Sequence, residues 1–399
     1  MNGVDKDIVI LDGARTAVGT YGGVFRQTSA TELGVVAAQG AIARAGVTPE
    51  DVENVVIGNV LQTSYDAVYQ ARHIALKVGI PREVPALTVN RLCGSGLQAI
   101  LTAAQGLMLD EAQVALAGGT ENLSQAPHVL YGARWGLELG QTGQLQDSLW
   151  AALTASHAGL PMALTAENLA EQYGITRAAQ DEFAYRSQRA AVAAQEAGRL
   201  AEEIVPAPGH GKKGEAILVD LDEHPRPGVT LESLARLKAR FKAGGTVTPG
   251  NASGINDAAA MLVLATGQWA AGKGLTPLGR LVSYAVVGVP PEIMGIGPAP
   301  AIRQALRRAD LTLADMDLIE VNEAFAAQYL AVEKELDLDR EKVNVNGGAI
   351  ALGHPLAASG ARLALTLLYE LRRRHGRYGV ASLCIGGGQG IAAVFECLQ

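Results

Sequence analysis

The sequence is poor in cysteine and has no long apolar run, and each absence excludes a class of protein. Its 399 residues include three cysteines, Cys93, Cys384 and Cys397. Their odd number and wide spacing argue against a disulfide framework and against a paired-cysteine metal site. The longest uninterrupted apolar run, Ala258 to Ala265, is too short to span a bilayer. We therefore expect no membrane-spanning helix.

Basic residues are also in the minority, with 33 lysines and arginines against 40 aspartates and glutamates. The net charge of -7 disfavours a protein that binds the phosphates of nucleic acid, so we expect no nucleic-acid partner. Residues 1–7 contain Asp5 and Asp7 and no apolar stretch, which predicts no secretory signal and a cytoplasmic location. The hydrophobic fraction of 48% excludes disorder.

Glycine, by contrast, is abundant: 47 residues, about 12% of the chain, against a usual share of about 7%. The glycines cluster in short loops that follow apolar segments. These segments alternate between strand-like and helix-like patterns, and Ser29 and Glu32 stand at capping-box spacing at the start of a helix that we predict to end at Arg44. The alternation predicts an α/β fold with a mostly parallel sheet covered by helices.

The same order of elements returns near the C-terminus. Residues 41–58 align without gaps with residues 305–322, at an offset of 264 (305 minus 41), and Arg44 then matches Arg308. This pattern predicts two similar halves, although two unrelated helix–loop–strand units also look alike.

A long segment between the two repeats breaks this rhythm. We predict that residues 1–122 and 246–272 form an N-terminal half, residues 123–245 an inserted domain, and residues 273–399 a C-terminal half. Basic residues concentrate in the insert, and they indicate either a solvated surface or a rim that binds anions. They include Lys212, Lys213, Arg226, Arg236, Lys238, Arg240 and Lys242.

Cys93 lies in the segment VNRLCGSGLQ (89–98), at a predicted strand-to-helix turn. A helix N-terminus offers unpaired N–H groups and the positive end of the helix dipole, which favour a thiolate and lower its pKa. The position therefore predicts a nucleophile, with a small buried apolar residue as the alternative.

His354 occupies the matching loop of the second repeat, NGGAIALGHPLAASG (346–360). An imidazole there can accept a thiol proton, although a turn histidine is the alternative. Cys384 precedes three glycines, whose N–H groups either stabilise an oxyanion or form a tight turn. Asn322 and Glu323 follow a predicted strand and either belong to a site or cap a helix. Ser253, in a Gly-rich loop, either contacts a ligand or makes a turn.

Together these motifs resemble those of the thiolases, and most closely the 3-ketoacyl-CoA thiolase and acetyl-CoA acetyltransferase branch. Five motifs occur in the same order, at 89–98, 250–257, 322–326, 346–360 and 384–390. The resemblance covers essentially the whole chain. It implies a five-layered αβαβα fold of two duplicated halves, an inserted loop domain that holds coenzyme A, and a homodimer or homotetramer.

The resemblance also implies roles for individual residues. Cys93 would accept the acyl group, His354 would activate it, and Cys384 would be a second acid or base. Asn322 would position a water that, with His354, binds one thioester oxygen, and the N–H groups of Cys93 and Gly386 would bind the other. The implied contacts to coenzyme A and its acyl group are Ser253, Arg226, Phe241 and Met162.

The implied reaction is the cleavage of a 3-ketoacyl-CoA to acetyl-CoA and a shortened acyl-CoA, which in reverse is a Claisen condensation. The thiolate attacks the 3-keto carbon, and coenzyme A then releases the acyl group from the enzyme. Coenzyme A is a substrate, and no metal or redox cofactor is needed. The sequence Pro161-Met162-Ala163 replaces the His-Met-Gly of short-chain biosynthetic members, which favours a β-oxidation enzyme with broad acyl tolerance.

Other classes remain open at this point. The segment GSGLQA (94–99) fits a dinucleotide-binding fingerprint, with Glu121 after the next strand, and so allows an NAD(P)-binding oxidoreductase. A noncatalytic acyl-CoA-binding protein of the same fold is a further alternative. A decarboxylating ketoacyl synthase is nearer, but the motif at 384–390 favours a thiolase.

Overall fold

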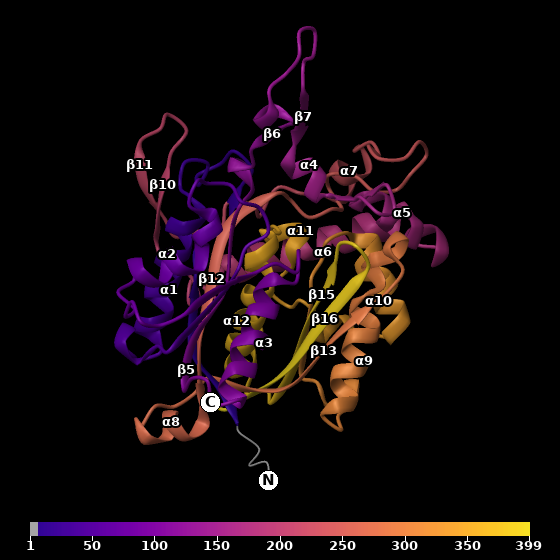
Figure 1. Ribbon diagram of the computed structural model, residues 1–399. Coiled ribbons are helices and arrows are strands. Elements are labelled where there is room, and N and C mark those ends of the chain that lie inside the picture. The colour runs from indigo at the N-terminus through magenta and orange to yellow at the C-terminus, as the bar shows by residue number, and fades with distance from the viewer. Residues whose placement is uncertain (1–6) are drawn as a thin grey trace.

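A computed structural model describes residues 7–399 (Figure 1). The expectation about a secretory signal concerns residues 1–7, of which the first six lie outside the described residues. The core of the fold is a ten-stranded sheet. Its strands are β1 (Ile8–Arg15), β2 (Gly19–Thr20), β3 (Asn54–Gly58), β4 (Ala86–Val89), β5 (Val114–Asn122), β12 (Asn256–Thr266), β13 (Gly279–Gly288), β14 (Leu318–Val321), β15 (Tyr378–Ile385) and β16 (Gln389–Cys397).

The sheet consists of two halves that meet at one seam. The strand order is β14-β15-β16-β13-β1-β12-β5-β3-β4, and β2 adds to β12. The halves join where Val9 and Ile10 of β1 pair with Arg280 and Gly279 of β13. The prediction of a mostly parallel sheet is wrong, because only β3, β4 and β5, and β14 with β15, run parallel. One reason is the short glycine turn between β15 and β16, which forces an antiparallel pair.

Helices fill the space between the two halves of the sheet and cover their outer faces (Figure 1). Helices α3 and α12 pack against each other in the middle, while α1 packs on β1 and β12, and α9 packs on β13 and β16. This arrangement confirms the predicted layered α/β fold. The helices of the two halves are α1 (Ala30–Arg44), α2 (Gln70–Lys77), α3 (Ser95–Met108), α8 (Gly267–Gly272), α9 (Pro298–Arg308), α10 (Ala326–Leu336), α11 (Ala349–Leu352) and α12 (Leu356–Arg374).

Burial explains the apolar segments of the sequence. The apolar run from Ala258 to Ala265 lies within β12, which is buried along its whole length. Helix α12 is buried from Leu356 to Leu371 because it is enclosed between the two halves of the sheet. Within residues 7–399, no helix has both the length and the apolar character needed to cross a membrane.

The two halves repeat local structure at the predicted offset. A 3₁₀ helix follows α1 at Pro49–Asp51, and its counterpart follows α9 at Leu313–Asp315. The Asp51 carboxylate accepts from the backbone N–H and hydroxyl of Thr48, and the Asp315 carboxylate accepts the same two bonds from Thr312. The shared cap confirms the predicted duplication.

The segment between β5 and β12 carries smaller elements, and the predicted limits of the insert stay a prediction. Its hairpin β6–β7 projects from the body of the molecule (Figure 1). The elements are β6 (His128–Tyr131), β7 (Gln144–Asp147), α4 (Ser148–Ala152), β8 (Thr154–Ala155), β9 (Leu160–Pro161), α5 (Met162–Gln172), α6 (Arg177–Glu196), β10 (Ala207–His210), β11 (Ala216–Val219) and α7 (Leu231–Ala235). The other 3₁₀ helices are Ala67–Tyr69, Leu123–Gln125, Ala133–Trp135, Pro291–Ile296 and Arg340–Lys342.

Glycine allows α12 to approach both α3 and β5 very closely. A Cβ atom at Gly96 would lie 2.3 Å from the backbone oxygen of Ala357, and one at Gly119 would lie 2.0 Å from the same oxygen. Any larger side chain would push the start of α12 away. Gly96 therefore has a packing role in this fold, which accounts for part of the segment that resembles a dinucleotide fingerprint.

Candidate active site

The turns before α3 and α12 carry Cys93 and His354, and both border the same region. Cys93 packs beside a small apolar cluster of Leu123, Leu149 and Leu356. These three side chains and His354 also line a cavity of about 340 Å³. The duplication thus brings equivalent loops of the two halves together.

Three hydrogen bonds orient His354. Its backbone N–H donates to the Oδ1 of Asn256 at 3.0 Å, and its Nδ1 lies 2.7 Å from the Ser359 hydroxyl. Its Nε2 lies 3.3 Å from the Asn322 amide nitrogen. Because an amide nitrogen only donates, Nε2 is the acceptor and the ring proton is on Nδ1, in a bond to Ser359. The Ser359 hydroxyl in turn donates to the Pro355 carbonyl oxygen at 3.3 Å.

The electrostatic setting keeps His354 uncharged. Burial is the main cause that lowers its pKa, and the positive charge of Arg362 adds to it, so that the pKa falls to about 3. At neutral pH the ring is therefore an imidazole whose Nε2 carries no proton and accepts the Asn322 N–H. This is the protonation state that a general base requires.

The pKa of Cys93 differs from the prediction. Burial raises it to about 11, although the N–H groups of Gly386 and of Cys93 itself act in the opposite direction. The expectation of a lowered pKa is wrong, since the sequence reveals a helix N-terminus but not the apolar side chains that pack around Cys93. The turn itself is tight, with Leu92 at a φ of 47°. Arg91 ties it to the glycine turn after Cys384 through a 2.7 Å bond to Gln389.

Two further sulfur-containing residues, Cys384 and Met162, lie in the same region as Cys93. Cys384 is fully buried near the end of β15, and burial, with a smaller contribution from Cys93, raises its pKa. Met162 packs beside Cys384, and a Cβ atom at Gly386 would lie 3.4 Å from the Met162 sulfur. The structure thus brings together Cys93, Cys384, Gly386 and Met162, which were predicted separately.

The cavity beside these groups holds most of the other predicted residues. Met162, Phe241, Ser253 and His354 all line it. Its remaining lining is mostly apolar: Tyr21, Leu123, Asp147, Leu149, Trp150, Leu153, Pro161, Ala163, Ala252, Gly254, Ile255, Phe325 and Leu356. Arg226 does not line it; it is exposed and borders a neighbouring hollow of about 180 Å³ with Leu234, Leu237 and Pro249.

The predicted basic rim is not a single surface. Lys212 and Lys213 lie in the turn between β10 and β11, whereas Arg236, Lys238 and Arg240 follow α7 on the other side of the molecule (Figure 1). Both groups are exposed. Only the second group is close in sequence to Phe241, which lines the cavity.

Asn322 and Glu323 do not cap a helix, since α10 begins only at Ala326. Asn322 contacts His354, and its Oδ1 is buried with no hydrogen-bond partner in the part of the chain that is described. Glu323 points elsewhere and accepts bonds from Ser187 at 2.6 Å and Asn344 at 2.9 Å. Asn322 therefore belongs to the site, whereas Glu323 supports the surrounding loops.

Sequence reasoning missed three residues that hold the site. Asn256 and Ser359 orient His354, and both lie inside motifs that were recognised. Glu121 is fully buried and accepts N–H bonds from Leu61 at 3.1 Å in one half and from Ala357 at 3.2 Å in the other. Burial raises the pKa of Glu121 to about 7. The sequence signal for Glu121 was an acidic residue shortly after two glycines. Its hydrogen-bond partners could not be predicted, because they are distant in sequence.

Comparisons with known proteins agree with this geometry. Residues 8–268 match the family model "Thiolase, N-terminal domain", and residues 275–397 match "Thiolase, C-terminal domain". The chain is 52% identical over 391 residues to the mitochondrial 3-ketoacyl-CoA thiolase of Homo sapiens, covering 98% of each chain. It is 50% identical over 394 residues to an acetyl-CoA acetyltransferase of Cupriavidus necator, covering 98% of this chain and 99% of the relative.

Solved structures show the same similarity. A crystal structure of human mitochondrial 3-ketoacyl-CoA thiolase aligns with a TM-score of 0.96 at 51% identity, over 99% of both chains. A crystal structure of that enzyme in complex with CoA aligns with a TM-score of 0.95 at 51% identity, over 98% of both chains.

Proposed function

Because the chain belongs to the thiolase family and is an acyltransferase, we propose that it is a degradative 3-ketoacyl-CoA thiolase that uses Cys93, His354 and Cys384. The observation that carries this proposal is the unprotonated Nε2 of His354 at a cavity beside two cysteines. An oxidoreductase and a noncatalytic binding protein have no comparable support in the site.

In the proposed cleavage, Nε2 of His354 takes the proton of the Cys93 thiol, and the thiolate attacks the 3-keto carbon. The N–H groups of Gly386 and Cys93, which already point at the Cys93 sulfur, are placed to stabilise a developing oxyanion. The free Oδ1 of Asn322 supports its proposed role in holding a water near the second thioester oxygen.

Carbon–carbon cleavage then releases the enolate of acetyl-CoA, and Cys384 gives it a proton. The raised pKa of Cys384 supports this role, because a buried thiol keeps its proton until a strong base such as an enolate forms beside it. Cys384, now a thiolate, takes the thiol proton of coenzyme A, and the coenzyme A sulfur attacks the acyl-Cys93 thioester. The shortened acyl-CoA leaves, and the Cys93 thiolate takes back its proton from His354. The proposed chemistry uses no metal or redox cofactor.

The size and lining of the cavity support the binding of an acyl group on a pantetheine arm. Its volume of about 340 Å³ and the apolar side chains of Leu149, Leu153 and Met162 suit an extended acyl chain and part of the pantetheine arm. Ser253 and Phe241 are proposed contacts to the pantetheine, and Arg226 to the nucleotide end. A relative's crystal structure holds CoA, which supports binding of the same substrate here.

The decisive assay is coenzyme A-dependent loss of the Mg-enolate absorbance of acetoacetyl-CoA and of a medium-chain 3-ketoacyl-CoA. Cys93→Ala and Cys384→Ala serve as matched controls that remove one sulfur each. We expect cleavage of both substrates, abolished in either variant. Cleavage of the C4 substrate alone would indicate an acetyl-CoA acetyltransferase, and cleavage of neither would refute the catalytic proposal.

We further propose a homodimer or homotetramer in the cytoplasm, with a role in fatty-acid β-oxidation. The projecting β6–β7 hairpin supports an assembly, since Leu130, Trp135, Leu139 and Leu145 on it are exposed. Light scattering of the whole chain and of Leu139→Glu tests this, because a monomer in both would contradict it. Cell fractionation tests the location, for which relatives named as mitochondrial suggest the competing compartment.

A further inference from the structure

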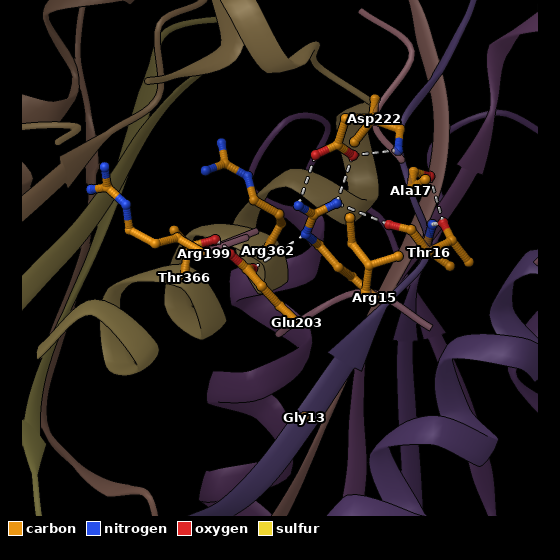
Figure 2. Close-up of polar contacts among 12 residues, drawn as sticks. Gly13, Arg15, Thr16, Ala17, Arg199, Glu203, Asp222, Arg362 and Thr366 are labelled. Carbon is orange, nitrogen blue, oxygen red and sulfur yellow. Dashed lines mark hydrogen bonds and ion pairs between the residues drawn. The ribbon is translucent and has the colours of Figure 1, made fainter. Parts of the chain in front are cut away.

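A buried network of charged side chains surrounds Arg15 (Figure 2). Arg15 on β1 donates from Nη1 and Nη2 to Asp222 at 2.8 and 2.9 Å, and from Nε to Glu203 at 3.2 Å. Arg362 on α12 is drawn beside this group, but no hydrogen bond joins it to the residues shown there. Arg362 therefore needs an explanation of its own.

Arg362 is a buried cation that forms one long ion pair with Glu320 and also acts on the nearby carboxyl of Glu203 through its charge. It is 5% exposed, and its Nη1 lies 3.5 Å from the Oε2 of Glu320 on β14. Among the residues that are described, neither Nη atom of Arg362 nor the Oε2 of Glu320 makes a hydrogen bond. Burying a cation in this way is costly, and fuller pairing would be the usual solution. Because the charge of Arg362 is poorly neutralised, it acts on nearby titratable groups.

The charge of Arg362 faces the back of the His354 loop. Arg362 and Arg15 line a cavity of about 10 Å³ together with Gly353, Pro355 and Ser359, which surround His354 in sequence. This volume holds at most one water molecule, so solvent does not screen the charge. Ser359 lies one turn before Arg362 on α12, and its hydroxyl contacts Nδ1 of His354.

We propose that Arg362, paired with Glu320, is a positioning residue whose buried charge adds to burial in disfavouring the imidazolium form of His354 in the resting enzyme. This inference rests on the proposed role of His354 as the base. The charge disfavours the imidazolium, so the proton stays on the Cys93 sulfur until substrate arrives, and it moves to Nε2 as the thiolate attacks.

Other titratable groups surround the loop, and Arg362 is the one whose charge acts on His354 in addition to burial. These groups are Arg15 on β1, Glu121 on β5, Glu203 after α6, Glu320 on β14, Glu323 after β14, His224 after β11, and Cys93 before α3. Glu320 modulates the effect, since burial raises its pKa to about 8 and its anion offsets Arg362 only above that pH.

The test is the rate at which iodoacetamide alkylates Cys93, located by mass spectrometry and measured from pH 6 to 9 in the full chain. The double variant Arg362→Met/Glu320→Gln removes, at similar volume, the cation and the carboxyl that ionises beside it at high pH, so that no unpaired anion is left at any pH of the series. Without the cation the thiolate–imidazolium pair forms more readily. We expect alkylation at pH 7 to rise about tenfold, the equivalent of one pKa unit. The charge-retaining Arg362→Lys should stay within about twofold of wild type.

An unchanged rate in the folded double variant would overturn the proposal, because a purely structural role would change the melting temperature and not this rate. If the double variant fails to fold, Glu320→Gln alone gives the opposite test: it should slow alkylation above pH 8, and a faster or equal rate there would overturn the proposal. His354→Ala separates the two hypotheses. If it leaves the wild-type rate unaltered, the role of His354 as the base fails instead.

Discussion

Arg15 offers the sharpest test of how the buried charges hold the fold together. Its guanidinium makes a two-point bond to Asp222 and a further bond to Glu203, and its side chain is 2% exposed. It therefore joins β1 to two points of the segment between β5 and β12. Arg15→Met keeps the length and the apolar part of the side chain but leaves both carboxylates without their cation.

The expected loss of stability follows from the hydrogen bonds that the two carboxylates keep in the variant. Asp222 retains the N–H of Val18 at 2.8 Å, and Glu203 retains the hydroxyl of Thr366 at 2.7 Å. Neither replaces a charge, so we expect a loss of about 3–5 kcal/mol in the free energy of unfolding, as for other buried pairs broken on one side. The loss should be larger at pH 8 than at pH 5. Burial already raises the pKa of Glu203, and a carboxyl with a raised folded pKa stabilises at low pH and loses that contribution as the pH rises.

Urea unfolding at both pH values measures this difference, with Arg82→Met as the matched control. Arg82 forms an ion pair with Glu83, but its side chain is 86% exposed, so its removal should cost less than about 1 kcal/mol. Equal losses in the two variants would refute the reasoning, and so would a loss in Arg15→Met that grows as the pH falls.

Three further predictions concern the site and its support. Ser359→Ala removes the partner of His354 Nδ1 and should lower kcat by about tenfold to a hundredfold, a part of the contribution of a general base, while KM stays within about twofold in steady-state assays; a rise in KM alone would contradict this. Gly119→Ala places a Cβ atom against Ala357 and should cost about 1–3 kcal/mol in urea unfolding, whereas Gly272→Ala, with open space around it, should cost nothing. Glu121→Gln should reduce the fall in stability between pH 5 and pH 8, because the folded pKa of about 7 lies above the ordinary 4.5 and its contribution is lost as the pH rises; an unchanged slope would show that Glu121 is ionised throughout.

The sequence revealed those parts of the molecule that depend on local pattern. The capping box at Ser29, the repeat of residues 41–58 at 305–322 and the placing of Cys93 and His354 on equivalent turns all follow from short segments. The raised pKa of Cys93 was not predictable in this way, because it depends on burial by side chains from several distant segments.

The pattern of the sequence also did not reveal the directions of the strands or the residues that support the site. Strand β12 comes more than a hundred residues after β5 yet lies between β5 and β1, so the pattern of apolar residues said nothing about its partners. Asn256 and Glu121 act through bonds that cross between the two halves, and such pairs carry no local signal.

The position of β12 also sets the order in which the chain can fold during synthesis. Strands β1 and β5 leave the ribosome long before Thr266, yet β12 must enter between them. Until then each of them presents an unpaired edge in a strongly apolar segment, a condition that promotes association between nascent chains. The N-terminal half therefore cannot complete its sheet until the chain has been made as far as Thr266. We expect expression of this chain to depend on translation rate and on chaperones that bind unpaired strand edges.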